Sequence, residues 1–188
     1  MKLFTRRTLV PAFLVLAVLA AFALYLFQPW KLFTNTTVDE SLPTAAPSAS
    51  APEQPGAAAE SPEAAPESPA AGPQELARGS FVSHEHSTSG TAKTVRLADG
   101  GQVLRFEDLK TDEGPDVRVY LSKRSAQDVE AGLGDGAVQL AGLKGNLGNQ
   151  NYVVPAGTDL SGFKSAVIWC KRFSVSFGAA DLVAVRGV

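Results

Sequence analysis

The sequence has few of the residues that most often carry chemistry or stabilise small scaffolds. Its 188 residues include one Cys, two His and one Met. A single Cys cannot close an intramolecular disulfide, which excludes a disulfide-stabilised scaffold. The formal net charge is −2, so a strongly basic nucleic-acid-binding protein is also excluded.

Catalytic and nucleotide-binding motifs are missing as well. The sequence contains no Walker A, HExxH or GxSxG pattern. Gly132, Gly134 and Gly136 lie outside any strand–helix–strand unit that would form a dinucleotide site. No hydrolase or transferase activity is indicated, so the protein would be at most a redox or electron-transfer protein. The sequence identifies no metal.

Charge divides the chain into three segments. Residues 1–31 carry +4 with no acid, residues 32–78 carry −6, and residues 79–188 carry twelve charges of each sign. We predict a cytoplasmic basic tail at 1–8 and a transmembrane signal-anchor helix at 9–27. A juxtamembrane segment and disordered linker would occupy 28–78, followed by one folded domain at 79–188.

Residues 9–27 form a run of nineteen uncharged residues. As a helix the run spans about 28 Å, close to the thickness of a bilayer's hydrocarbon core, so we expect contact with the lipid bilayer. The basic tail predicts a cytoplasmic N-terminus, and thus a single-pass plasma-membrane protein with an extracytoplasmic C-terminal domain. The alternative is a cleaved signal peptide, whose apolar region is usually shorter than this run.

Pro, Ala, Glu and Ser dominate residues 43–77, where no apolar periodicity is present. Such a composition has too little apolar surface to offset the entropy of ordering, so it predicts disorder. Alternating prolines and like charges favour an extended chain. We therefore expect a spacer that holds the C-terminal domain away from the membrane.

Short alternating apolar runs separated by turn residues follow. They predict an all-β fold, an antiparallel β-sandwich of about eight strands. A Gly/Asn-rich loop is expected at 142–151, and carboxylates at 112–116 are typical of a turn. The strongest strand signal covers 166–177. The expected strands are 81–87, 91–98, 102–109, 117–121, 138–140, 152–155, 166–177 and 179–185.

Cys170 is the first candidate site residue. Lys171 and Arg172 follow it, and nearby positive charge favours the thiolate, which is the reactive and metal-binding form. Three interpretations remain open: a redox or prosthetic-group thiol, an intermolecular disulfide, and a small buried side chain. If the strand is regular, one face holds Ile168, Cys170, Arg172 and Ser174, and the core-facing side holds Trp169, Phe173, Val175 and Phe177.

His84 and His86 are the other candidate ligands. Two positions apart on a strand, they would share one face and offer ring nitrogens to a metal or haem. Two ligands are an incomplete site, and an exposed strand face explains the pair equally. A shared site with Cys170 requires that the fold bring the three residues together.

Several motifs around Cys170 resemble the DM-thirteen domain family, known from Skeletor-type proteins. The resemblance covers nearly all of 79–184. The segment at 27–33, FQPWKLF, also resembles membrane-anchored proteins of actinobacteria. The motifs are GSF (79–81), HSTSGTA (86–92), GPDVRVYLS (114–122), LKGNLGNQNYVVP (143–155), SAVIWC (165–170) and FSVSFGAADL (173–182).

This resemblance implies a β-sandwich-type domain with a characteristic Cys, proposed to act in electron transfer as a bare thiol or by holding a group such as haem. Cys170 takes that position, and His86 matches a His often found before the Ser-Gly-Thr. No haem-binding or cytochrome domain accompanies it in this chain, so a redox partner would act in trans. The competing hypothesis is a non-catalytic cell-surface binding or envelope-structure module with a buried structural Cys170.

Overall fold

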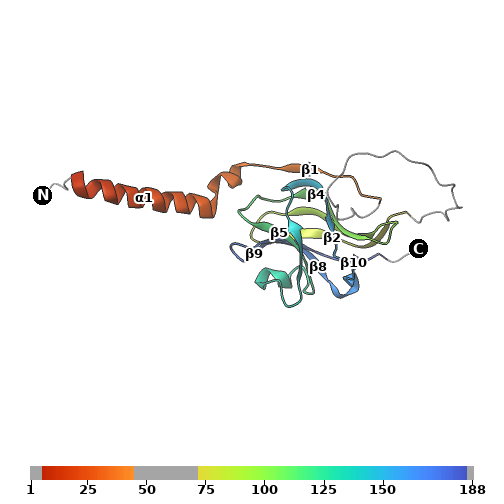
Figure 1. Cartoon of the computed structure of the whole chain (residues 1–188). Helices are drawn as coiled ribbons and strands as arrows, with labels where there is room; N and C mark the ends of the chain where they lie inside the picture. Colours follow the sequence, from red (N-terminus) through yellow and green to blue (C-terminus); the bar gives the residue numbers. More distant parts are fainter. Residues whose placement is uncertain (1–5, 45–71, 186–188) are drawn as a thin grey trace, which may run out of the picture.

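The structure of the protein, a computed structural model, describes residues 6–44 and 72–185 (Figure 1). Residues 1–5 of the predicted tail and most of the predicted linker lie outside the described residues. The helices are α1 (Arg6–Phe27), η1 (Pro29–Phe33), η2 (Asp128–Ala131) and η3 (Leu160–Gly162). The strands are β1 (Thr37–Asp39), β2 (Gln74–Ser83), β3 (Ser89–Arg96), β4 (Gln102–Lys110), β5 (Val117–Ser122), β6 (Val138–Gly142), β7 (Leu147–Val153), β8 (Ser165–Cys170), β9 (Val175–Asp181) and β10 (Val183–Ala184).

α1 projects from one end of the β-domain (Figure 1). It has 22 residues, and it begins three residues before the predicted span. Within the described residues, one helix is long and apolar enough to cross a membrane, and none of its apolar window is buried. An N-terminal signal sequence can pass the same test of length and apolar composition.

The domain is mostly β, as predicted, but its strands form one curled mixed sheet, a half-barrel. The order of the nine main strands is β1-β7-β4-β3-β2-β9-β8-β5-β6, and β10 pairs with β2 beside this path. Every neighbouring pair is antiparallel except β1 and β7, which are parallel. The predicted antiparallel sandwich of eight strands therefore differs from the observed architecture.

The long strand β2 explains this difference. Its residues Gln74 to Ser80 pair with β3, whereas Phe81 to Ser83 pair with β9. One continuous strand thus joins the two groups of strands that a sandwich would place in separate sheets. Alternation of apolar residues predicts strands and faces, but it does not specify which strands are neighbours.

The concave face of the sheet encloses the main core, and Cys170 is part of it. A second cluster, which includes Trp169 and Val167, packs under η2 on the other face of β8. Fourteen buried residues form the main core: Phe81, Ala92, Leu104, Phe106, Leu109, Val119, Leu121, Tyr152, Val154, Ala166, Ile168, Cys170, Phe177 and Ala180.

Residues 34–42, which we call the strap, add an edge strand to the sheet. In β1, Thr37 lies opposite Leu147 and Asp39 opposite Asn149 of β7. The Leu147 amide donates to the Thr36 carbonyl at 3.2 Å, and the Glu40 amide donates to the Asn149 carbonyl at 2.9 Å. The sheet therefore begins within the range 28–78 that the sequence indicated as juxtamembrane segment and linker.

The position of the strap changes the role of the Pro-rich segment. β1 precedes residues 45–71 in the chain, so that segment connects two strands of the same sheet. Nine residues join the end of α1 to β1. The prediction that the Pro-rich segment separates the domain from the helix is therefore wrong, because the chain enters the sheet before it reaches that segment.

Glycines of the β6–β7 region make room for the strap. A Cβ atom at Gly145 would meet the Thr36 carbonyl oxygen and lie 2.9 Å from Val38 Cγ2. A Cβ atom at Gly148, whose φ is +96°, would meet the Val38 carbonyl oxygen. Both positions require a residue without a side chain because the strap backbone approaches so closely.

Candidate functional site

Cys170 is the last residue of β8, directly before the turn at residues 171–174. The predicted single strand over 166–177 is in fact a hairpin, β8–turn–β9. The turn contains Ser174, a non-glycine residue with φ +55°. Since the chain reverses here, the predicted common face of Cys170 with Arg172 and Ser174 is wrong.

The thiol is enclosed. Cys170 has 0% exposure and packs in the main core with Ile168 and Phe177. Phe177 was predicted on the opposite face, but the hairpin places it on the same side. In the ladders, Cys170 lies opposite Val117 of β5 and Val175 of β9. The sulfur is therefore inaccessible from solvent in this structure.

Val117 separates the Cys170 region from a surface hollow. A cavity of about 380 Å³ is lined by Lys31, Gly114, Val117, Leu143 and others. Val117 and Leu143 also pack against the main core. A Cβ atom at Gly114 would lie 2.7 Å from Val117 and 2.9 Å from Phe177, so the Gly114 backbone covers this end of the core.

Phe177 forms a bulge that sequence reasoning missed. Ile168 lies opposite Gly178 and Trp169 opposite Ser176, so Phe177 has no partner in β8. Its carbonyl oxygen instead accepts from the His84 amide at 3.0 Å, the His86 amide at 3.4 Å and the Thr88 hydroxyl at 3.1 Å. Gly178, directly after it in a strand, is the sequence signal that indicates a bulge.

The two histidines lie in the bend after β2, where their side chains take different partners. His84 Nδ1 is 2.7 Å from the Ser176 hydroxyl. His86 Nδ1 is 2.9 Å from an Asp112 oxygen, and its ring lies 3.7 Å from the Phe177 ring, centroid to centroid. The regular strand on which both would share a face ends at Ser83.

The arrangement does not fit a haem held by Cys170. A ligand sulfur must lie about 2 Å from the metal, and the enclosed thiol has no open side for an iron and its macrocycle. Among residues 6–44 and 72–185, no group of three or more His, Cys, Asp and Glu side chains is placed to hold a metal ion. We therefore derive no step through haem or a metal.

The carboxylates at 112–116 also separate from one another. Asp112 turns to His86, Glu113 accepts from the hydroxyls of Thr34 and Thr36, and Asp116 pairs with Arg118. These contacts bind segments together, so the cluster does not form one acidic site.

The predicted Gly/Asn-rich loop at 142–151 becomes strand β7 from Leu147 onward. Its amide side chains hold the strap. The Asn146 side chain accepts from the Thr36 amide at 2.7 Å and donates to Asn35 at 2.8 Å. The Asn149 side chain donates to Asp39, and the Asn151 side chain donates to the Ser41 carbonyl. These bonds replace the solvent contacts of a loop.

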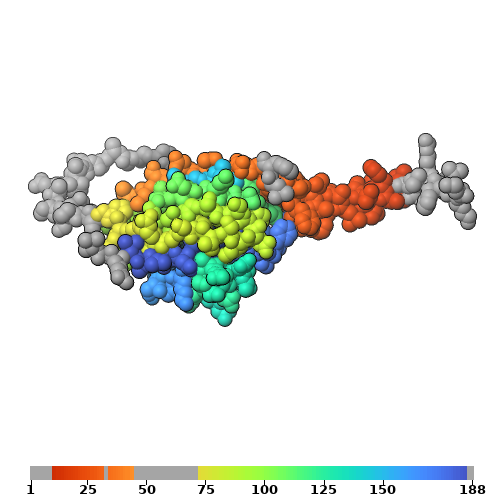
Figure 2. Space-filling model, turned by 180° about the vertical axis from the view of Figure 1, so that it is seen from behind, coloured from red at the N-terminus to blue at the C-terminus, as the bar shows by residue number. Residues whose placement is uncertain are grey.

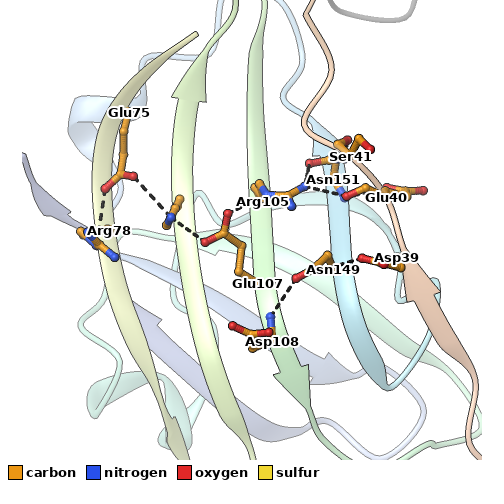
Figure 3. Close-up of polar contacts among 11 residues, drawn as sticks. Asp39, Glu40, Ser41, Glu75, Arg78, Arg105, Glu107, Asp108, Asn149 and Asn151 are labelled. Carbon is orange, nitrogen blue, oxygen red and sulfur yellow. Dashed lines mark hydrogen bonds and ion pairs between the residues drawn. The ribbon is translucent and has the colours of Figure 1, made fainter.

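A ladder of charged side chains crosses the outer face of the sheet (Figure 3). Lys93 bridges Glu75 at 3.6 Å and Glu107 at 2.5 Å, and Arg105 continues the ladder from Glu107 at 2.9 Å. Arg105 also donates to the Glu40 carbonyl at 2.9 Å. Burial raises the pKa of Glu107, but the hydrogen bonds and charges of Lys93 and Arg105 outweigh it, and the net pKa is lowered.

Glu40 anchors the strap end of this ladder. Its carboxylate accepts from Lys144 at 2.6 and 2.9 Å and from the Asn151 amide at 2.8 Å. Burial raises the pKa of Glu40, and the contacts with Lys144 and Asn151 lower it by more. Every member of the ladder has a partner, so the ladder binds the strap to the sheet and presents no open site.

The described residues define a class of domain: one curled β-sheet around an apolar core, with an enclosed thiol at the end of an inner strand. The chain belongs to the DM13 family, whose description is "Electron transfer DM13" and whose model matches residues 80–182, just over half of the chain. No curated protein and no solved structure matches the chain significantly. α1 and the strap lie outside the matched residues.

Proposed function

We propose that this protein is a membrane-anchored electron-transfer domain in which Cys170 is the redox-active group. The observation that carries the proposal is membership of a family described as electron transfer, with the only Cys of the chain inside the matched residues. α1 would be the anchor, and the basic residues at its N-terminal end favour a cytoplasmic N-terminus and an extracytoplasmic domain.

The enclosure of the thiol determines how it would react. Attack on a partner requires direct access to the sulfur, which the closed hairpin prevents. Lys171, Phe173 and Ser174 are exposed, so the turn residues themselves contribute little to the core. The free energy of local opening in proteins ranges from about zero up to the global free energy of unfolding. We propose that the free energy of opening the β8–β9 hairpin lies well below the global value.

The chemistry of a lone thiol needs a partner that contributes sulfur. The Cys170 thiolate attacks one sulfur of a partner's disulfide, a bond forms between the two sulfurs, and the other partner sulfur leaves as a thiolate. A second partner thiol resolves the mixed disulfide and restores Cys170.

A second candidate function is favoured by one specific observation, the complete burial of Cys170. In that case the domain is a non-catalytic binding or envelope-structure module, and Cys170 is a small apolar core residue.

Thiol-exchange kinetics on the full chain in nanodiscs separate the two candidates. The test reagent is a small aromatic disulfide, and the global free energy of unfolding is measured in parallel. The global free energy of unfolding is typically about 5–15 kcal/mol. A thiol that is exposed only in the unfolded protein therefore reacts at least ~10³ times more slowly than a free thiol. The redox proposal predicts a thiol-exchange rate clearly faster than the rate that the measured unfolding equilibrium allows. An exchange rate equal to that limit supports the structural role of Cys170.

Ser174→Gly is the matched hairpin variant for this experiment. Glycine adopts positive φ without strain, so the substitution stabilises the closed turn and leaves the core unchanged. Exchange through the open hairpin therefore slows in Ser174→Gly. Exchange through global unfolding slows only in proportion to the gain in global stability.

A further inference from the structure

The end of the domain that carries the hairpin turn also contacts the end of α1. Arg172 donates to the carbonyl oxygens of Tyr25 at 3.2 Å and Leu26 at 2.8 Å. Both carbonyls belong to the last turn of α1, where no intrahelical donor is available and the helix dipole is negative. The Arg172 side chain therefore caps the helix and fixes the domain against it.

Two further contacts hold this junction. The Phe173 ring stacks on the Phe27 ring with centroids 5.8 Å apart, and the Arg172 guanidinium lies 5.8 Å from the centroid of the Tyr25 ring. On the strap side, Lys31 donates to the Gly114 carbonyl at 3.0 Å. Figure 2 shows the blue β8–β9 turn against the orange base of α1.

The surface around the junction has the composition of a bilayer interface. Tyr25, Phe27, Trp30 and Phe173 are 66%, 61%, 51% and 45% exposed, an unusual density of exposed aromatic rings. Aromatic residues concentrate at the level of lipid headgroups, where one side is apolar and the other is wet. This set, with the cations beside it, is called the junction surface below.

The charges of the junction surface have one sign. Lys31, Lys171 and Arg172 lie in it, and neither residues 24–33 nor residues 171–174 contain an acid. The acids of the neighbouring segment, Glu113 and Asp116, are bound to the strap threonines and to Arg118. Anionic headgroups are the complementary partner for a surface of aromatic rings and cations.

We infer that the junction surface lies in the headgroup layer of the same membrane that α1 crosses, and binds anionic phospholipid headgroups. The inference rests on the proposed role of α1 as an anchor. The stretch that could cross a membrane, Val10–Lys31, ends inside the junction surface, so the bilayer boundary would fall at this level. The domain therefore sits on the membrane with the Cys170 end toward the lipid.

Site-directed spin labels on the full chain test this seating. Cys170→Ala provides a cysteine-free background, and single labels are placed at Phe173→Cys and at Val183→Cys. Val183 is the matched control because it is 66% exposed, and it belongs to β10 near the C-terminus, away from α1 in Figure 1. The protein is reconstituted in nanodiscs of phosphatidylcholine with or without phosphatidylglycerol, and label collisions with oxygen and a water-soluble nickel complex are compared.

We expect the label at 173 to collide more with oxygen and the label at 183 to collide more with the nickel complex. Phosphatidylglycerol should strengthen this difference. Lys171→Gln should reduce the ratio of membrane-bound domain to domain free of the membrane surface about fivefold in these discs. Because Lys171 is exposed and outside the core, the variant retains the fold.

Three other outcomes would overturn the inference. Equal nickel accessibility at both positions means that the domain moves freely above the bilayer. Protection of position 173 only in discs with two copies means that the junction surface binds a second chain. Failure of the chain to incorporate into the discs refutes the anchor itself, which distinguishes failure of the proposed function from failure of the seating.

Discussion

Gly145→Ala should displace the strap from the sheet. The added methyl group would meet the Thr36 carbonyl oxygen and come within 2.9 Å of Val38 Cγ2. The Thr36 carbonyl is held by the Leu147 amide, so the strap must move or the loop at 145 must distort. Overpacking of this kind costs about 1–3 kcal/mol. At about 4 °C per kcal/mol, the domain's Tm should fall by roughly 4–12 °C.

The matched control is Gly142→Ala, because a Cβ at Gly142 has no atom within 4 Å. Its stability should stay within about 0.5 kcal/mol of the wild type. Hydrogen exchange locates the effect: the amides of Leu147 and Asn151 donate to the strap and should lose protection in Gly145→Ala. Amides of β8 should remain protected in both variants.

An unchanged Tm and a fully protected Leu147 amide in Gly145→Ala would refute the reasoning. The sheet would then be complete without residues 34–42, and the close approach of the strap would have no energetic consequence. A loss of protection throughout the domain, in contrast, would mean that the strap is required for the whole fold.

Three further predictions concern acid stability and the core. The lowered pKa values of Glu40 and Glu107 contribute stability above their ordinary value of 4.5 and lose it as the pH falls through the folded pKa. Urea unfolding from pH 7 to pH 3 should therefore show declining stability below about 4.5, with a shallower decline in Glu107→Gln; parallel curves would contradict the ladder. Cys170→Ser should cost about 1–3 kcal/mol more than Cys170→Ala, since the serine hydroxyl enters an apolar core, and equal stabilities would contradict enclosure of the thiol. Phe177→Ala should destabilise by about 3–5 kcal/mol and accelerate thiol exchange at Cys170, whereas unchanged exchange would show that Phe177 does not cover the sulfur.

The local β-structure was predictable from the sequence because strand faces follow the alternation of apolar residues. Residues 102–109 and 117–121 match β4 and β5 closely. The hairpin inside 166–177 was not predictable in this way. The turn at 171–174 contains no Gly or Pro, and apolar residues continue on both sides of it.

The strap was hidden for a different reason. Three residues of β1 have no apolar periodicity of their own, and their stability comes from Asn side chains more than 100 positions away in the chain. The close approach of the strap requires glycine at positions 145 and 148. In the sequence, however, these glycines are equally typical of a loop. Long-range side-chain bonds leave no local pattern.

The functional role of Cys170 stays a prediction. The residue lies within the matched family domain, but its burial depends on the register of three strands, β5, β8 and β9. The partners of the histidines depend on the bulge at Phe177, which shifts β9 by one residue. A one-residue shift reverses which side chains face the core, and composition does not reveal it.

The redox state of Cys170 in the native membrane tests the central claim most directly. Membranes containing the full chain are equilibrated in thiol–disulfide buffers of graded potential, quenched in acid, alkylated, and analysed by mass spectrometry. An electron-transfer thiol predicts a reversible transition between free Cys170 and its mixed disulfide while the fold remains intact. A thiol that stays reduced at every potential and converts only in unfolded protein would contradict the account.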